Sequence, residues 1–282
     1  MRIAYVNGEY LPMAEAKISV LDRGFNFADG IYEISAVVGG QLIDNPAHLQ
    51  RLKKSLGEIS LVMNVSFSDL EAIMAELVER NSVDEGLVYI QVTRGVAERD
   101  FAFPKDTPTT LVVFTQKKNL IDNPKAKTGI EVITYPEIRW SRCDIKSVAL
   151  LGPVLAKQAA AEAGVGEAVF VDNGNIVEGA SSSVFIVSKG GEIITRPKSH
   201  SILPGITRKT VLAIVAEQGL KFVERTITVE EFKSAAEAFI TSASTFVMPV
   251  VDLDGVQIGD GAPGPVTNRL RERYIEFARS GS

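Results

Sequence analysis

The chain has 282 residues, of which 45% are hydrophobic and 23% are charged, and its formal net charge at pH 7 is −5. This is an ordinary globular composition, and its acidic balance gives no reason to expect a nucleic acid or an anionic membrane as a partner. A single cysteine, Cys143, excludes an intramolecular disulfide, and no run is apolar enough for a signal segment or a membrane span, so we expect a cytoplasmic protein.

The chain begins with signals for hairpins and a helix. Dipeptides that favour tight turns, at positions 7–8 and 39–40, separate short apolar runs and predict two β-hairpins. Residues 45–60 then predict a helix, because apolar side chains recur on one face and a proline stands in the first turn. Asn45 is the expected cap of this helix.

A second helix and two strands follow before the chain becomes polar. Residues 68–81 predict a helix that starts with a capping box from Ser68 to Glu71. Two apolar runs, at 86–95 and 109–116, are rich in β-branched and aromatic residues and predict strands. The first part of the chain should therefore pair a sheet with helices.

A polar segment divides the sequence near its middle. Residues 118–128 contain an Asn-Pro step and few apolar side chains, which makes them the best linker in the chain. We therefore expect an N-terminal α+β domain over residues 1–117 and a C-terminal domain over residues 129–282.

The second half alternates strands and helices without a regular strand–helix–strand repeat, so the α+β class is favoured over α/β. The expected strands cover 130–136, 168–172, 183–188, 192–196, 221–227 and 237–243. The expected helices cover 148–163 and begin after 207, at 228 and at 266, and a further hairpin is expected at 254–255.

Composition also removes several kinds of chemistry. The chain has two histidines, His48 and His200, and one cysteine, so a histidine-rich or thiolate metal site is excluded and no metal is expected. It contains no Gly-x-Ser-x-Gly elbow and no Walker loop, and its Gly-x-Gly-x-x-Gly pattern at residues 259–264 does not lie in a strand–helix–strand unit. Hydrolase, P-loop and dehydrogenase functions are therefore disfavoured.

A lysine can act as a covalent catalyst by itself. Lys146 is the second-last residue of the stretch RWSRCDIKS, which precedes VALLGPVLAKQAAA, an apolar segment that should form a buried helix. A Schiff base needs a neutral amine, and burial favours the neutral form because it disfavours the ammonium. For a single lysine the ordinary alternative is a side chain that points to water.

Two other segments match the needs of pyridoxal 5'-phosphate (PLP). This cofactor needs an amine for its aldehyde, an acid for its ring nitrogen and an anion site for its phosphate. Glu178 in VEGASSSVF offers the acid, and Thr207 in LPGIT starts a helix whose N–H groups suit a phosphate. Each signal alone also fits a turn residue or a plain helix cap.

Taken together, six segments occur in the order found in one family: DRGFNFADGIYE, HLQRL, YIQVTRG, RWSRCDIKS, VEGASSSVF and LPGIT. They resemble the fold-type-IV PLP-dependent aminotransferases, most of all the D-amino-acid transaminases, with branched-chain aminotransferases and aminodeoxychorismate lyase as relatives. The resemblance runs to about Pro249. It implies a two-lobed α+β fold, with a small N-terminal domain, a larger C-terminal domain with a barrel-like sheet, and a homodimer.

The resemblance also implies a role for individual residues. Lys146 matches the Schiff-base lysine, which also moves the substrate proton, and Glu178 matches the carboxylate at the pyridine nitrogen. The other implied cofactor contacts are Arg51, Leu203, Ile206, Thr207, Ser242 and Ala243. The implied substrate contacts are Tyr32, Arg99, Phe101 and Ser182. His48 and Cys143 are expected to be structural.

Two positions depart from the family pattern. Phe101 stands where the D-amino-acid transaminases typically carry a histidine, and Ala243 stands where a phosphate-side threonine is usual. We expect transfer from a D-amino acid to pyruvate or 2-oxoglutarate. Branched-chain L-amino acids, (R)-amines and aminodeoxychorismate remain alternatives within the family. A non-catalytic binding protein is disfavoured, because it would need neither Lys146 nor Glu178.

Overall fold

The computed structural model describes residues 1–281, which divide into two units, each with its own sheet and core. Unit 1 comprises Met1–Asn119, Ile145–Ala149 and Gly281, and unit 2 comprises Leu120–Asp144 and Leu150–Ser280. The short segment that carries Lys146 thus clusters with unit 1. The domain boundaries drawn from the sequence stay a prediction.

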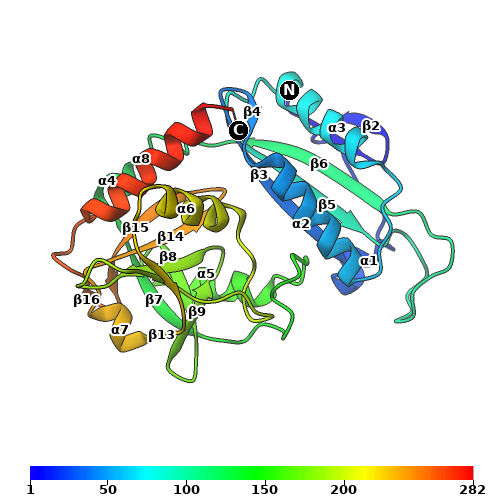
Figure 1. Ribbon diagram of the computed structural model, residues 1–282. Coiled ribbons are helices and arrows are strands. Elements are labelled where there is room, and N and C mark those ends of the chain that lie inside the picture. The colour runs from blue at the N-terminus through cyan, green and yellow to red at the C-terminus, as the bar shows by residue number, and fades with distance from the viewer. Residues whose placement is uncertain (282) are drawn as a thin grey trace. The chain divides into compact units, whose positions relative to one another are not determined.

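Unit 1 is an antiparallel sheet in the order β2-β1-β6-β5-β3-β4, with helices packed on it (Figure 1). Its strands are β1 (Ile3–Val6), β2 (Glu9–Pro12), β3 (Gly30–Val38), β4 (Gln41–Leu42), β5 (Glu85–Thr93) and β6 (Thr110–Lys117). Its helices are α1 (Arg23–Phe27), α2 (Asn45–Glu58) and α3 (Phe67–Arg80). Both predicted hairpins are confirmed: β1 pairs with β2, and β3 pairs with β4 through two glycines with positive φ.

The alternation of side chains along β3 places a carboxylate in the core. Ile31 and Val37 are fully buried in the apolar core beneath α2 and α3. Because every second side chain of a strand lies on the same face, Glu33 and Ser35 also lie on the core side, where both have polar partners on α2. Tyr32 lies on the opposite face of the sheet.

Both predicted helix caps of unit 1 are wrong. The cap of α2 is Asp44, in the left-handed region at φ 56°, and its side chain makes no capping hydrogen bond. Asn45 is the first helical residue, and its buried amide bridges the Ser35 hydroxyl and the Glu71 carboxylate. The cap of α3 is Ser66, whose hydroxyl accepts from an N–H in the first turn. The predicted capping box from Ser68 to Glu71 starts two residues later, and its sequence fits a helix start as well as that of Ser66 and Asp69 does.

Unit 2 contains the larger sheet, in the order β12-β11-β10-β14-β15-β7-β8-β9-β13, with β16 paired to β15. Its strands are β7 (Ile130–Pro136), β8 (Glu167–Asp172), β9 (Asn175–Gly179), β10 (Ser183–Val187), β11 (Ile193–Thr195), β12 (Phe222–Glu224), β13 (Ile227–Thr228), β14 (Glu237–Ser242), β15 (Phe246–Leu253) and β16 (Val256–Gln257). Its helices are α4 (Pro124–Thr128), α5 (Leu151–Glu162), α6 (Ile206–Glu217), α7 (Val229–Lys233) and α8 (Pro265–Arg279).

This sheet is curled, as the connection between its two ends shows. The strand predicted over 221–227 is in fact two strands, β12 and β13, separated by residues 225–226. β12 pairs with β11 at one end of the order, and β13 pairs with β9 at the other. Two residues can join the ends only if the sheet bends round on itself. The α+β class and the barrel-like second sheet are confirmed.

The helix expected over 148–163 starts later and is not buried. The backbone N–H of Val148 donates to Gly30 O at 3.1 Å, so this residue pairs with the edge of β3 instead of starting the helix. In α5 the buried residues are Ala156 and Ala160, whereas Leu151 is 72% exposed. Among residues 1–281, no helix has the length and apolar character needed to cross a membrane.

Candidate active site

Lys146 is held against the edge of β3 by backbone hydrogen bonds. Its carbonyl accepts from the N–H of Tyr32 at 2.9 Å, and its own N–H donates to the Ser55 hydroxyl at 3.3 Å. The alternation of an extended chain then separates two neighbours: Ile145 enters the core of unit 1, while the Lys146 side chain is half-buried, with Nζ 4.2 Å from the centroid of the Tyr32 ring. Lys146 and Tyr32, which were predicted separately as site residues, are therefore in contact.

A stack of three aromatic rings holds the side chain of Tyr32 in place. The Tyr32 ring stacks on Tyr89 with centroids 5.6 Å apart, and Tyr89 stacks on Phe114 at 4.7 Å. Burial, and to a lesser extent the neighbouring Tyr32, raises the pKa of the Tyr89 hydroxyl, which donates to Gln91 at 2.8 Å. The surface beneath the Lys146 amine is thus rigid and aromatic, and an ammonium ion is attracted to such a ring face.

Arg51, the predicted phosphate residue, is buried beside the fully buried carboxylate of Glu33. Arg51 Nε donates to Glu33 Oε2 at 2.9 Å and Nη2 donates to Oε1 at 2.5 Å, which is a two-point ion pair. His48 Nδ1 lies 2.9 Å from Oε1 of the same carboxylate. Burial alone would raise the pKa of Glu33, but Arg51 and His48 outweigh it and hold that pKa below its usual range.

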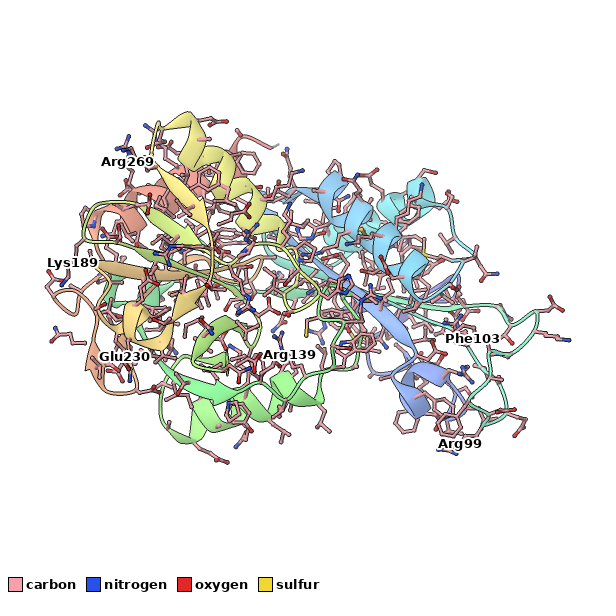
Figure 2. The ribbon with its side chains drawn as sticks, turned by 60° about the horizontal axis from the view of Figure 1, so that its bottom comes forward. Arg99, Phe103, Arg139, Lys189, Glu230 and Arg269 are labelled. Carbon is pink, nitrogen blue, oxygen red and sulfur yellow. The ribbon has the colours of Figure 1, made fainter. Side chains whose placement is uncertain are left out.

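Arg99 lies on an exposed loop of unit 1, where Figure 2 labels it, and Phe101 is exposed on the same loop. The Arg99 guanidinium carbon is 5.1 Å from the centroid of Phe27 and 5.7 Å from that of Phe101. The Phe101 side chain is 78% exposed. No carboxylate among the described residues pairs with Arg99, so its charge is available to an external anion.

Glu178, at the end of β9, is a buried acid of unit 2. Its Oε2 accepts from the Leu203 N–H at 3.1 Å, and its Oε1 accepts from Arg139 Nη1. Burial raises the pKa of Glu178 to about 7, and the raising effect is opposed by Arg139 and by the Leu203 N–H. The carboxylate therefore changes charge near physiological pH. The Leu203 backbone, predicted to lie near the cofactor, is one of its direct partners.

Ser182 is buried, and its hydroxyl proton already has an acceptor. It donates to Glu167 Oε2 at 3.2 Å, and the Ser181 hydroxyl does the same at the same distance. Lys157 Nζ lies 2.7 Å from the other oxygen of Glu167. Because a hydroxyl has one proton, Ser182 in this arrangement can offer a substrate only an acceptor.

The N-terminus of α6 has the predicted features of an anion site. Gly205 is the N-cap and provides no side-chain hydrogen bond to the first turn, which contains the buried Ile206 and Thr207. A Cβ on Gly205 would lie 2.8 Å from the Ser183 hydroxyl, so a side chain would separate this turn from β10. A helix N-terminus without a side-chain cap presents N–H groups and a partial positive charge to an anion.

The turn after β14 carries the remaining predicted residues. The Ser242 hydroxyl is 3.2 Å from that of Ser244 and 2.8 Å from that of Thr245, whereas Ala243 has none to offer. Arg271 of α8 fixes the backbone of this turn, because Nη1 donates to Thr245 O at 2.9 Å and to Val247 O at 2.8 Å. Thr245 was not among the predicted residues.

The predicted residues thus form several local groups. Unit 1 contains Tyr32, Arg51, Arg99, Phe101 and Lys146, and unit 2 contains Glu178, Ser182, Leu203, Ile206, Thr207, Ser242 and Ala243. Sequence reasoning missed two residues: Glu33, whose carboxylate pairs with Arg51, and Arg139, whose guanidinium pairs with Glu178. Arg139 begins the very motif that carries Lys146. Within residues 1–281 no three histidine, cysteine or acidic side chains gather as a metal site would require.

The chain is similar to known proteins along its whole length. Residues 30–253 match the family described as Amino-transferase class IV. A D-alanine aminotransferase of Staphylococcus haemolyticus is 41% identical over 100% of both chains, and one of Bacillus licheniformis is 39% identical over 94% of this chain and 93% of its own. A solved branched-chain amino acid aminotransferase of T.th., with pyridoxamine 5'-phosphate, superposes with a TM-score of 0.91 at 25% identity, over 100% of this chain and 95% of that one.

Replacing Glu33 should test the buried ion pair. Glu33→Gln leaves the Arg51 charge buried without its carboxylate, and breaking such a pair costs ~3–5 kcal/mol of unfolding free energy. Glu76→Gln, which removes the exposed partner of Arg80, is the matched control and should cost less than about 1 kcal/mol. Urea denaturation followed by circular dichroism measures both.

The pH dependence gives the same test a second outcome. Since the pKa of Glu33 is lowered by folding, its stabilisation is complete above the unfolded value of about 4.3 and is lost as the pH falls through the lower folded value. The difference in unfolding free energy between wild type and Glu33→Gln should therefore become smaller below about pH 4. A difference that stays constant from pH 8 to pH 3 would contradict the ion pair.

Proposed function

The chain belongs to the class IV aminotransferase family, and on this premise we propose that it transfers the amino group of a D-amino acid to a 2-oxo acid with PLP as cofactor. The observation that carries the proposal is the full-length similarity to D-alanine aminotransferases. D-Alanine is accordingly the amino donor to test first, with pyruvate or 2-oxoglutarate as acceptor. The buried acid Glu178 and the amine of Lys146 support it independently, because PLP chemistry needs both kinds of group.

The residues of the chain fit the groups of PLP one by one. We propose that Lys146 Nζ binds the aldehyde carbon and that Glu178 binds the ring nitrogen. Residues for the phosphate are proposed to be Arg51, Ile206, Thr207 and Ser242, with the backbone of Ala243. The glycine cap of α6, which leaves the first turn without a side-chain partner, supports the phosphate assignment.

Each side chain then has a defined task. When bound, PLP supplies a carbon that accepts the amino nitrogen and a ring that draws electron density from the substrate Cα. Lys146 would take the proton from the substrate Cα and deliver it to the cofactor carbon that holds the nitrogen, which a lysine does well once it is neutral. Glu178 keeps a negative charge beside the ring nitrogen. Leu203 packs against one face of the ring, and the Tyr32 ring beneath Lys146 limits where the amine can move.

Arg99 is proposed to bind the substrate carboxylate, with Phe101 as an apolar neighbour. The support is chemical: the Arg99 guanidinium is exposed and stacked on two rings, without a carboxylate partner within the described residues. Ser182 is proposed as a hydrogen-bond acceptor for the substrate, since its proton goes to Glu167. Phe101 offers no hydrogen bond, so amine donors without a carboxylate are compatible with this loop.

We also propose a cytoplasmic homodimer. The free Cys143 supports a reducing compartment. Leu151, Val154 and Leu155 form one apolar face of α5 and are 72%, 57% and 45% exposed, which is unusual for three neighbouring large apolar side chains of a monomer. A second copy covering this face would remove it from water.

Replacing Lys146 tests the covalent assignment. Lys146→Ala should bind PLP without a covalent bond and lose turnover by several orders of magnitude, because both the anchor and the proton carrier are gone. Lys189→Ala, on an exposed turn, is the control and should behave as the parent enzyme. Mass spectrometry after borohydride reduction measures the covalent bond. PLP still trapped on the chain of Lys146→Ala would show that another lysine holds it.

Replacing Arg99 tests the substrate assignment. A charge-assisted contact with a carboxylate is worth roughly 1.5–3 kcal/mol, so Arg99→Leu should lower kcat/KM for D-alanine by about one to two decades. A carboxylate-free (R)-amine should lose little. Arg269→Leu, on the exposed face of α8, controls for charge. Equal losses for D-alanine and the amine would mean that Arg99 has a structural role.

A charge on α5 tests the dimer. Val154→Glu places a carboxylate in the middle of the exposed apolar face and should weaken association at least about tenfold, since a buried interface charge costs more than about 1.4 kcal/mol. Val62→Glu, at a site that is 85% exposed, is the control. Light scattering during size-exclusion chromatography across a dilution series measures both. A dimer unchanged in Val154→Glu would place the interface elsewhere.

A further inference from the structure

We propose that Arg139 is a positioning residue for the reaction: it holds the Glu178 carboxylate in its charged form and in one orientation. The inference deepens the proposed function and rests on the assignment of Glu178 to the ring nitrogen of PLP. It adds that Glu137 competes for the same guanidinium, so that Arg139 and Glu137 act on Glu178 in opposite directions.

The Arg139 guanidinium is fixed on every side. Its Nε donates to Glu137 Oε1 at 2.9 Å, and its Nη2 donates to Glu137 Oε2 at 2.5 Å. Nη2 also donates to Ser201 O at 3.3 Å, and the guanidinium carbon lies 4.3 Å from the centroid of the Phe170 ring. This two-point pair leaves Nη1 directed at Glu178 Oε1. Figure 2 shows Arg139 within unit 2.

The same contacts set the orientation of Glu178. Oε1 accepts from Arg139, while the Leu203 N–H donates to Oε2 at 3.1 Å and more weakly to Oε1 at 3.3 Å. With a donor on each oxygen, the carboxylate cannot rotate without losing a hydrogen bond. An ionised carboxylate has about four acceptor positions, so Oε2, which has a single donor, keeps room for a further donor such as a ring N–H.

The charges explain why the guanidinium matters. Glu178 and Arg139 are both buried, with side chains 7% and 9% exposed, and burial pushes the carboxyl toward its neutral form. The pKa of Glu178 is raised to about 7 by burial even with Arg139 present, and Glu137 adds to the rise. The Cys143 thiol beside them stays neutral, since burial raises its pKa to about 11.

Two carboxylates sharing one guanidinium have a net charge of −1 when all three are ionised. One positive charge on the PLP ring nitrogen would balance it. The proton between Glu178 and the ring nitrogen can lie on either partner, and Arg139 favours its transfer to nitrogen, because the guanidinium stabilises the carboxylate that remains. Without Arg139 the proton returns to a Glu178 oxygen and the ring becomes neutral.

The position of this proton can be observed directly in the holoenzyme. We would reconstitute the protein with PLP carrying 15N at the ring nitrogen and follow its chemical shift between pH 6 and pH 9. Arg139→Gln should move the shift toward the neutral ring, and Arg139→Lys, which restores the charge without the fork, should lie between. Glu137→Gln frees the guanidinium for Glu178 and should move the shift toward the protonated ring. Glu178→Gln sets the reference for a ring without its acid.

Activity should follow the same order. If the pKa of Glu178 rises from about 7 to 8 or above, its ionised fraction at pH 7.5 falls about threefold or more. The kcat of Arg139→Gln should fall at least by that factor, and its KM should change less. The acidic limb of the pH profile of kcat should move to higher pH.

The outcomes separate the two proposals. A shift that does not change in Glu178→Gln would overturn the assignment of Glu178 to the ring nitrogen. A shift that changes in Glu178→Gln but moves in the same direction in Arg139→Gln and Glu137→Gln would overturn the role of Arg139, because a merely structural residue has no reason to give opposite signs. If Arg139→Gln fails to fold, Glu137→Gln still decides, since it retains Arg139.

Discussion

The arrangement around Lys146 depends on the pairing of a five-residue segment with the edge of β3. Residues 145–149 follow more than twenty residues of unit 2 in the sequence, yet they belong to the sheet of unit 1. Two backbone hydrogen bonds with β3, from Tyr32 and Val148, fix their direction, and Ile145 in the core fixes their register. Strand alternation does the rest, since a side chain next to a buried isoleucine must lie on the other face. A lysine that moved by one position would enter the core.

The pKa values of two buried carboxylates, Glu33 and Glu178, are shifted in opposite directions. Glu33 shares its oxygens between Arg51 and His48, and these two partners more than offset burial, so the pKa of Glu33 is lowered. Glu178 has one guanidinium and must share it with Glu137, so burial prevails and its pKa is raised. The first arrangement gives a permanent charge suited to holding a structure together. The second gives a group whose charge responds to its surroundings, which suits chemistry near neutral pH.

The sequence was informative where a local pattern has one structural meaning. The hairpins at 7–8 and 39–40 followed from glycines that accept positive φ, and the motifs singled out Lys146 and Glu178. It was less informative where several residues compete for one role: Ser66 and Ser68 could both cap α3, and Asn45 and Asp44 are equally good caps by type. The apolar stretch after Lys146 was predicted to be a buried helix. An apolar face in a sequence does not show whether that face packs inside the chain or lies exposed on its surface, as it does on α5. The link from Arg139 to Glu178 spans 39 residues and that from Glu33 to Arg51 spans 18, and no local spacing rule reaches that far.

Arg271 holds the turn after β14 through backbone atoms, so the path of the turn does not depend on which side chains it carries. Arg271 also donates to Leu120 O at 2.7 Å and Ile121 O at 2.9 Å, so its guanidinium is surrounded by four backbone carbonyls. Carbonyls are present whatever the side chain, so the turn keeps its path when a hydroxyl is gained or lost. Ala243 stands in such a place. During natural or directed evolution, residues 242–245 can therefore exchange serine, threonine and alanine and so change which hydroxyl groups the turn presents, while its backbone is inherited unchanged.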